Sequence, residues 1–180
     1  MPASTKIWLV TLNEGHSMIE TAFSGIWTNT LMAATFHTND RDEHYGLFQC
    51  NDEPDLLAIV LGNCAIDANP EVPKPDDKPL SRLMEFITHR ELFHLDMDVN
   101  ELPLDPGKIV IAFSESQPAG SDSLPGKGKW GVSMYHSNGA NKPMWIHVAS
   151  SEDADRLRQI GTVKTFSKIL ESHVASRTAE

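Results

Sequence analysis

The stretch from Leu92 to Val99 constrains the fold more than any other, because its apolar and polar residues alternate without a break. Alternation with period 2 is typical of a strand that buries one face. The apolar face would carry Phe93, Leu95, Met97 and Val99, and the polar face would carry His94, Asp96 and Asp98. The sequence therefore predicts a strand over 92–99 whose polar face places an imidazole beside carboxylates.

Other apolar runs predict further strands, and apolar stripes with helical spacing predict three helices. The strands are expected at Lys6–Leu12, Tyr45–Cys50, Leu56–Gly62, Lys108–Ser114, Trp130–His136 and Met144–Ala149. The helices are expected from Ser17 to about Phe36, from Pro79 to about His89, and from Ser150 to about Val174. This order predicts an α+β protein in which an antiparallel sheet is covered on one face by helices.

Proline, glycine and serine mark the connections. Residues 66–79 hold four prolines and predict an exposed loop, and Glu115–Lys129 predicts a mobile loop or a lid beside a pocket. Glu101–Gly107 is a predicted turn and a candidate boundary between two halves of the chain. We therefore expect residues 1–180 to form a single domain, or two degenerate halves of about 1–104 and 107–180.

The net charge limits the kinds of binding partner that the protein can have, and the cysteine count indicates its cellular compartment. A net charge of −10 argues against nucleic acid or an anionic membrane as the main partner, because binding phosphates needs a basic surface. The two cysteines form no disulfide framework, and no apolar run reaches the ~20 residues of a membrane span. We expect a cytoplasmic protein.

Several catalytic signatures are absent from the sequence. It holds no Gly-rich phosphate loop, no G-x-S-x-G, no C-x-x-C and no H-E-x-x-H, which argues against a nucleotide enzyme, a serine hydrolase and a zinc protease. His89, His94, Asp96 and Asp98 follow no recognised metal spacing. We predict no metal site.

The polar face of the 92–99 strand gives the first candidate site. An imidazole oriented by a carboxylate supports general acid–base catalysis, which makes His94, Asp96 and Asp98 candidate catalytic residues. The alternative is a solvated strand face on which charges prevent edge-to-edge aggregation.

His147 is the preferred catalytic residue in the second half of the chain. Met144, Ile146 and Val148 would form an aliphatic face packed under the last helix, which would leave Trp145 and His147 facing a cavity. Aromatic residues would hold a substrate there, and the candidates are Trp145, Tyr135, Trp8 and Trp130. The alternative is a hydrogen-bonded core histidine.

The two halves of the sequence are weakly similar to each other. Tyr45–Gln49 matches Trp130–Met134 in position, and the run Met144–Ala154 reads as a strand, a short turn and an acidic helix start. In this the chain resembles the dimeric α+β barrel superfamily, the fold of antibiotic-biosynthesis monooxygenases and several polyketide cyclases. The resemblance implies a ferredoxin-like α+β barrel, a pocket lined by inward side chains, no cofactor, and a homodimer or closure within one chain.

Two functions from different classes follow. The first is a cofactor-independent enzyme that acts on a hydrophobic polyketide- or terpenoid-like intermediate, by acid–base cyclisation, dehydration or isomerisation, or by cofactor-free oxygenation. The second is a non-catalytic small-molecule-binding or stress-type barrel. The convergence of inward histidines and aspartates on one cavity would separate them. The cone-shaped fold of scytalone-type dehydratases is a third possibility, but those proteins usually open with helices.

Overall fold

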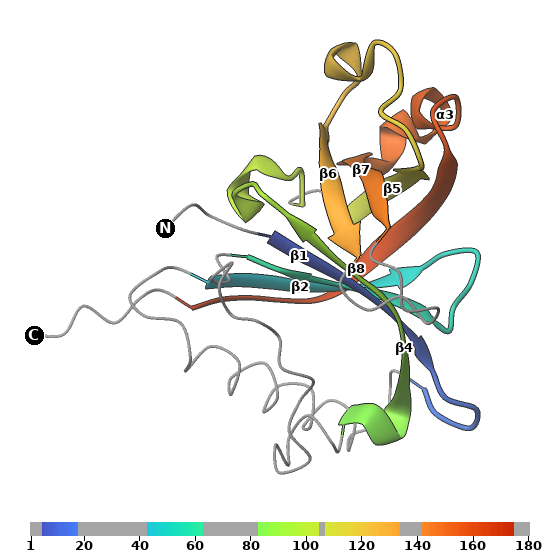
Figure 1. The fold of residues 1–180 in the computed structure, drawn as a ribbon. Helices are drawn as coiled ribbons and strands as arrows, with labels where there is room; N and C mark the ends of the chain where they lie inside the picture. The colour runs from blue at the N-terminus through green and yellow to red at the C-terminus, as the bar shows by residue number, and fades with distance from the viewer. Residues whose placement is uncertain (1–4, 18–42, 63–82, 105–106, 134–141, 175–180) are drawn as a thin grey trace, which may run out of the picture.

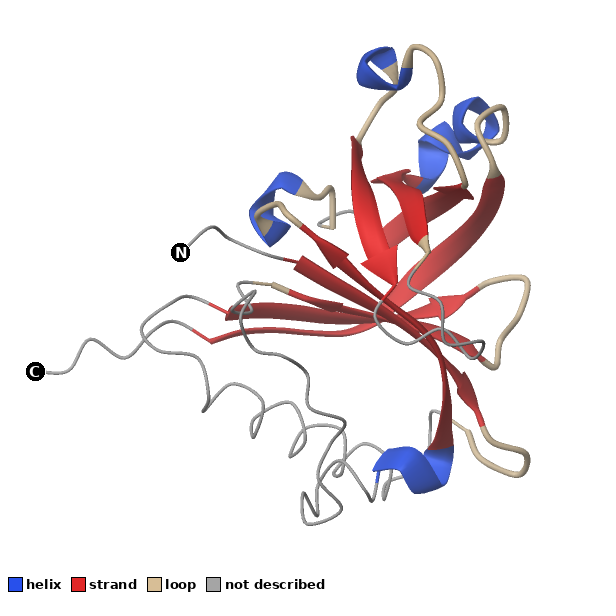
Figure 2. Cartoon of the chain, in the orientation of Figure 1, coloured by secondary structure: helices blue, strands red, loops and turns tan. Residues whose placement is uncertain are grey.

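The computed structural model describes residues 5–17, 43–62, 83–104, 107–133 and 142–174. Within them the chain forms eight strands, which Figures 1 and 2 show curling around a common centre. They are β1 (Thr5–Leu12), β2 (Glu43–Cys50), β3 (Leu56–Leu61), β4 (Ile87–Leu95), β5 (Lys108–Ser114), β6 (Lys127–Ser133), β7 (Pro143–Ser150) and β8 (Thr162–Val174).

Short helical segments complete the described part of the chain. Residues 83–86 are helical and lead directly into β4. The others are η1 (Val99–Glu101), η2 (Ser121–Ser123), η3 (Ser151–Asp153) and α3 (Ala154–Leu157). None of the helices in these ranges is long and apolar enough to cross a membrane.

The eight strands close into one antiparallel barrel within a single chain, in the order β1-β3-β2-β8-β5-β7-β6-β4. The first four strands lie in the order β4-β1-β3-β2, and the last four repeat it as β8-β5-β7-β6. Pairing of β2 with β8 and of β4 with β6 joins the two sets. Closure removes the free sheet edges that each set would otherwise expose.

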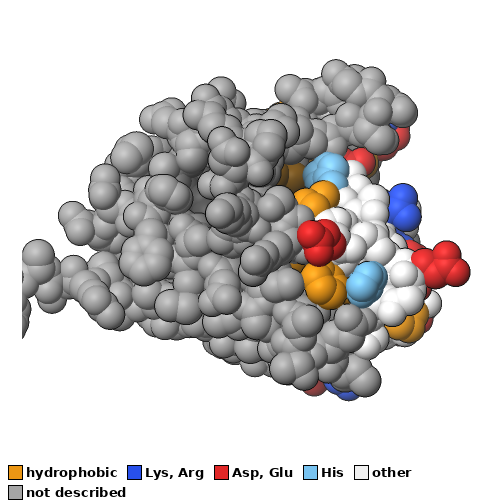
Figure 3. Space-filling view, turned by 90° about the horizontal axis from the view of Figure 1, so that it is seen from below, with side chains coloured by type: hydrophobic (Ala, Val, Ile, Leu, Met, Phe, Trp, Pro, Cys, Tyr) orange, Lys and Arg blue, Asp and Glu red, His pale blue; other side chains and the backbone are white. Residues whose placement is uncertain are grey.

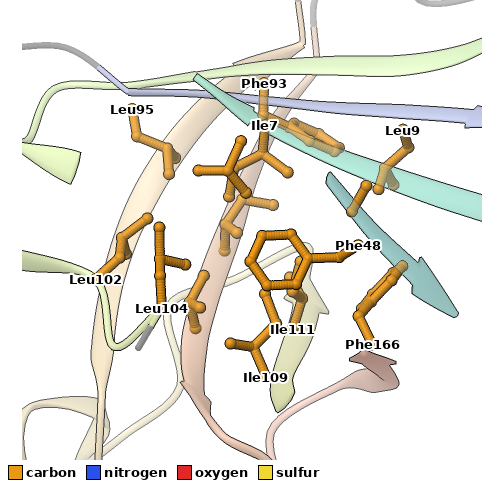
Figure 4. Close-up of a cluster of buried hydrophobic side chains, with 14 of the residues drawn as sticks. Ile7, Leu9, Phe48, Phe93, Leu95, Leu102, Leu104, Ile109, Ile111 and Phe166 are labelled. Atoms are coloured by element: carbon orange, nitrogen blue, oxygen red, sulfur yellow. The ribbon is translucent and has the colours of Figure 1, made fainter. Parts of the chain in front are cut away.

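Apolar side chains fill the barrel interior. Figure 4 shows a large part of this interior cluster, which includes Ile7, Leu9, Phe48, Phe93, Leu95, Leu102, Leu104, Ile109, Ile111 and Phe166. An eight-strand barrel is just wide enough for its side chains to fill it. The inward faces of the described strands therefore form a packed core.

Two further clusters lie on the outer surface of the barrel. Val10 of β1 and Leu57 of β3 pack with Leu83 and Phe86 of the helical turn. On the other side, Val110 of β5 packs with Leu157 of α3. Helical segments thus cover the outside of the sheet, whereas strand residues make up most of the interior cluster, with Met97, Val99, Leu102 and Leu104 added by the segment around η1.

The structure confirms most of the predicted strands but corrects two boundaries. The predicted strand 92–99 ends at Leu95, where the chain bends into η1, although Met97 and Val99 still reach the core. The second helix does not extend to His89, because β4 begins at Ile87.

The predicted last helix is wrong for most of its length. Only Ala154–Leu157 is α-helical, and Thr162–Val174 is strand β8, which pairs with β2 and β5. Gly161 marks the change: a Cβ there would lie 2.2 Å from the carbonyl oxygen of Phe113. The predicted first helix, apart from Ser17, and the loop 66–79 lie outside the described residues.

Candidate functional site

A pocket of about 500 Å³ opens at one end of the barrel. The ends of β1, β4 and β8 and the β2–β3 turn form its walls. Its lining residues are Leu9, Thr11, Glu53, Pro54, Asp55, Leu56, Arg90 and Lys164. Small-molecule sites commonly have volumes of ~300–1,000 Å³ and combine apolar walls with a few polar groups.

Arg90 reaches the pocket because β4 carries an irregularity there. Leu9 pairs with Glu91 and Val10 pairs with His89, so Arg90 is the extra residue between two pairs. A bulge of this kind re-aims a side chain, and bulges are frequent at barrel rims. The Nε of Arg90 donates a hydrogen bond of 2.6 Å to the Thr11 hydroxyl, which fixes the plane of the guanidinium.

Lys164 faces the same space from β8. It pairs with Ile111, whose side chain lies in the interior cluster, and directly paired residues point to the same face. The Lys164 ammonium donates to the Glu53 carboxylate in the β2–β3 turn. This ion pair brings an acid and a base together at the pocket mouth.

The β2–β3 turn is held in place by more than this ion pair. The backbone N–H of Asn51 donates to the carbonyl of Thr165 at 2.9 Å, and the Ser167 hydroxyl donates to the Asn51 side chain at 2.8 Å. Leu56 donates its backbone N–H to the carbonyl of Glu53 at 2.8 Å. The turn that carries Glu53 is therefore anchored to β8 by its backbone.

The floor of the pocket is apolar. Leu9 and Leu56 belong to the interior cluster but stay 7% and 8% exposed, so they meet the pocket without leaving the core. The pocket thus joins an apolar surface to two cations, Arg90 and Lys164, and two carboxylates, Glu53 and Asp55. In the view from below, the described part of the surface mixes acidic, basic, histidine and apolar side chains, with no extended basic area (Figure 3).

The structure reverses the predicted faces of β7. Ile146 and Val148 lie in the interior cluster, with Met144 packed against it, and Ala149 packs with Leu157 of α3 on the outside. The prediction that the aliphatic face packs under a helix is therefore wrong. Residues of the opposite parity, which include Trp145 and His147, point outward.

His147 is buried on this outer face, with only 1% of its surface exposed. Its Nε2 lies 2.8 Å from the carbonyl oxygen of Pro125, so Nε2 carries the proton and donates it. Both its Nδ1 and the indole Nε1 of Trp145 are buried and have no hydrogen-bond partner among the residues that the structure describes. A Cβ on Gly128 would lie 2.4 Å from the Trp145 ring and 2.6 Å from His147 Nδ1, so glycine is needed for this close packing.

His94 also faces outward, between Lys6 of β1 and Val132 of β6. Its neighbours in sequence, Phe93 and Leu95, fill the interior instead. Burial and, to a smaller extent, the charge of Lys6 lower the pKa of the His94 imidazole to about 4. The ring is therefore neutral at pH 7, and its buried Nε2 has no hydrogen-bond partner within the described part of the chain.

The two aspartates of the first candidate site lie beyond the end of β4. Asp96 is exposed. Asp98 caps η1: its carboxylate accepts from the backbone N–H and the side-chain amide of Asn100, each at 2.9 Å. The structure thus gives Asp98 a structural role and does not bring it to the pocket.

The predicted aromatic residues do not gather in one place. Trp8 packs against the outer cluster of the first four strands and donates from Nε1 to His89 Nδ1 at 2.8 Å. Trp130 is 40% exposed and meets Trp145 edge-to-face, with ring centroids 5.7 Å apart. Tyr135 lies outside the described residues.

Sequence reasoning missed the charged residues of the pocket, Arg90, Glu53 and Lys164. Glu53 lies between two predicted strands, and Lys164 lies within the predicted last helix. Arg90 becomes a pocket residue only through the β-bulge, which no sequence pattern signals. In the described ranges, no group of three or more His, Cys, Asp or Glu residues is arranged to hold a metal ion.

Two solved structures share this fold across nearly the whole chain. One is the "putative monooxygenase from Lactobacillus acidophilus NCFM", with a TM-score of 0.54, 12% identity and 100% coverage of both chains. The other is the "Putative Chlorite dismutase TA0507", with a TM-score of 0.54, 8% identity, and 94% of this chain and 96% of that chain covered. No family model matches the sequence, and no curated protein matches it.

At these identities the likeness establishes the fold alone. The chain has the α+β fold of these two proteins, which are named as enzymes. Membership of the antibiotic-biosynthesis monooxygenase and polyketide cyclase superfamily stays a prediction.

Proposed function

We propose that the protein is a small-molecule enzyme that acts on a hydrophobic carbonyl compound, of polyketide or terpenoid type, by cofactor-independent acid–base chemistry. One observation carries the proposal: the pocket at the barrel end joins an apolar floor to the Glu53–Lys164 ion pair and to Arg90. Isomerisation, aldol-type cyclisation and β-elimination of water from carbonyl compounds share one first step, the removal of a proton beside the carbonyl group.

The three charged residues have distinct roles in this proposal. The Glu53 carboxylate takes a proton from the carbon next to the carbonyl group, and the electron pair of that C–H bond moves to the carbonyl oxygen as an enolate. The Lys164 ammonium stabilises the oxygen's negative charge, and the Arg90 guanidinium binds and orients the polar end of the substrate. Return of the proton to another position completes an isomerisation.

The repeated strand order supports the architectural part of the proposal. Each set of four strands has the order of a ferredoxin-like unit, so we infer two such halves, residues 1–104 and 107–180, that close on each other. A cytoplasmic homodimer remains part of the proposal, but the closed barrel leaves no open sheet edge between the halves to drive it.

Hydrogen–deuterium exchange tests the chemistry without knowledge of the natural substrate. The aromatic ketone 2-tetralone is incubated with protein in D₂O, and loss of its α-proton signals is followed by NMR. We expect the wild type to exceed the buffer rate, and Glu53→Gln to lose most of this excess, since a general base contributes ~10²–10⁴ in rate. Glu152→Gln, an exposed residue of η3 that does not line the pocket, is the matched control.

A non-catalytic binding protein is the second candidate. It is favoured by the placement of His94 and His147 on the outer surface, away from the pocket. The same experiment separates the two: saturation-transfer signals from bound ketone, without exchange above buffer, would support binding alone. Exchange that is unchanged in Glu53→Gln would remove Glu53 from the mechanism.

A further inference from the structure

The pocket contains one cation that no described carboxylate neutralises. Lys164 is paired with Glu53, but Arg90 makes a hydrogen bond only to Thr11, and no ion pair joins it to a carboxylate of the described residues. Arg90 is exposed and lines the pocket, and its hydrogen bond to Thr11 uses Nε and leaves the two terminal nitrogens for a ligand. An exposed guanidinium held in one plane is a preformed receptor for a planar anion.

We propose that the ligand of this pocket is an amphipathic carboxylate, with its head group on Arg90 and its apolar part on Leu9 and Leu56. This inference rests on the proposed function and names the substrate class of the same site. The terminal N–H groups of arginine match the two oxygens of a carboxylate and form paired, charge-assisted hydrogen bonds. The Thr11 hydroxyl already holds Nε, so less freedom is lost when the anion binds.

The charge balance favours a single negative charge on the ligand. The lining residues include two cations, Arg90 and Lys164, and two carboxylates, Glu53 and Asp55, so the empty pocket is formally neutral. A monoanion paired with Arg90 gains attraction at short range. A phosphate dianion would meet the repulsion of both carboxylates with only one unpaired cation to offset it.

The apolar part of the ligand has a defined place. Leu9 and Leu56 are the two lining residues shared with the interior cluster, and they lie on paired strands, β1 and β3. A chain or ring on this surface would continue the packed core of the barrel toward the solvent. Burial of this area contributes the same free energy for an acid and for its neutral analogue, so a matched pair of ligands isolates the head-group contribution.

Isothermal titration calorimetry with octanoate and 1-octanol tests the inference on the full chain at pH 7.5 and low salt. We expect octanoate to bind at least tenfold more tightly than octanol. In Arg90→Gln the two affinities should come within about twofold of each other, and Arg90→Lys, which keeps the charge but loses the planar fork, should be intermediate. Arg158→Gln removes an exposed cation that does not line the pocket and should leave the preference intact.

Each outcome decides between the two proposals. Equal binding of octanoate and octanol by the wild type, or an octanoate preference that survives in Arg90→Gln, would overturn the carboxylate inference and leave the pocket as a site for neutral compounds. Absence of binding by either probe would overturn both. Circular dichroism confirms that each variant is folded, and if Arg90→Gln does not fold, Arg90→Lys decides alone by its loss of preference.

Discussion

His94 gives the chain a stability that depends on pH. Burial and the Lys6 charge lower its folded-state pKa to about 4, whereas an imidazole in the unfolded chain titrates near its ordinary value of 6.5. Between these values the unfolded state binds more protons than the folded state, so stability falls as the pH decreases. The contribution of His94 is complete above pH 6.5 and is lost as the pH falls toward 4.

The magnitude follows from the two pKa values. Between pH 7.5 and 4.5 these pKa values would change the contribution of His94 to the free energy of unfolding by about 2.5 kcal/mol if the imidazole were not screened by solvent. The imidazole is partly exposed, so solvent screening reduces this, and we expect wild type to lose about 1 kcal/mol more than His94→Gln over the same interval. Because the other titrating groups are common to both proteins, the comparison isolates His94.

Urea unfolding at several pH values between 7.5 and 4.5 measures how much more stability the wild type loses than His94→Gln. The comparison requires that the two proteins have the same m-value. Lys6→Met is an informative second variant: it removes the repulsion but leaves the burial, so it should reduce the pH dependence only in part. Parallel stability curves for wild type and His94→Gln would refute the placement of His94 as a partly buried, neutral residue on the outer face.

Three further predictions follow from the structure. Gly128→Ala should lower the free energy of unfolding by ~1–3 kcal/mol, because its Cβ would overlap Trp145 and His147; an unchanged Tm in calorimetry would contradict this close packing. Asp98→Ala should cost ~1 kcal/mol through loss of the η1 cap, whereas Asp98→Asn should be nearly neutral because asparagine caps equally well; equal urea midpoints for the two variants would contradict the capping role. Light scattering tests the homodimer: a mass near twice 19.9 kDa confirms it, and a mass near 19.9 kDa rejects it.

The strands could be predicted because their signal is local. Lys108–Ser114 is strand β5 with the expected bounds, since an uninterrupted apolar run has few alternatives to a buried strand. The segment after Gly161 was interpreted as a helix because Val163, Phe166 and Ile169 also fit helical spacing. Its strand conformation depends on pairing with β2 and β5, which are distant in sequence.

The candidate site was harder to predict because faces are set by register. The alternation in β7 was correctly recognised, but sequence alone does not say which face meets the barrel, and an error in that choice moves every side chain to the other side. His147 therefore lies under the Pro125 carbonyl and not in the interior. The pocket residue Arg90 depends on a bulge, which only the paired strands reveal.

A crystal structure of the protein soaked with octanoate tests the central claim most directly. The account predicts ligand density in the barrel-end pocket, with the carboxylate on Arg90 and the chain against Leu9 and Leu56. Density on the outer face of β7, beside Trp145 and His147, with the barrel-end pocket empty, would contradict it.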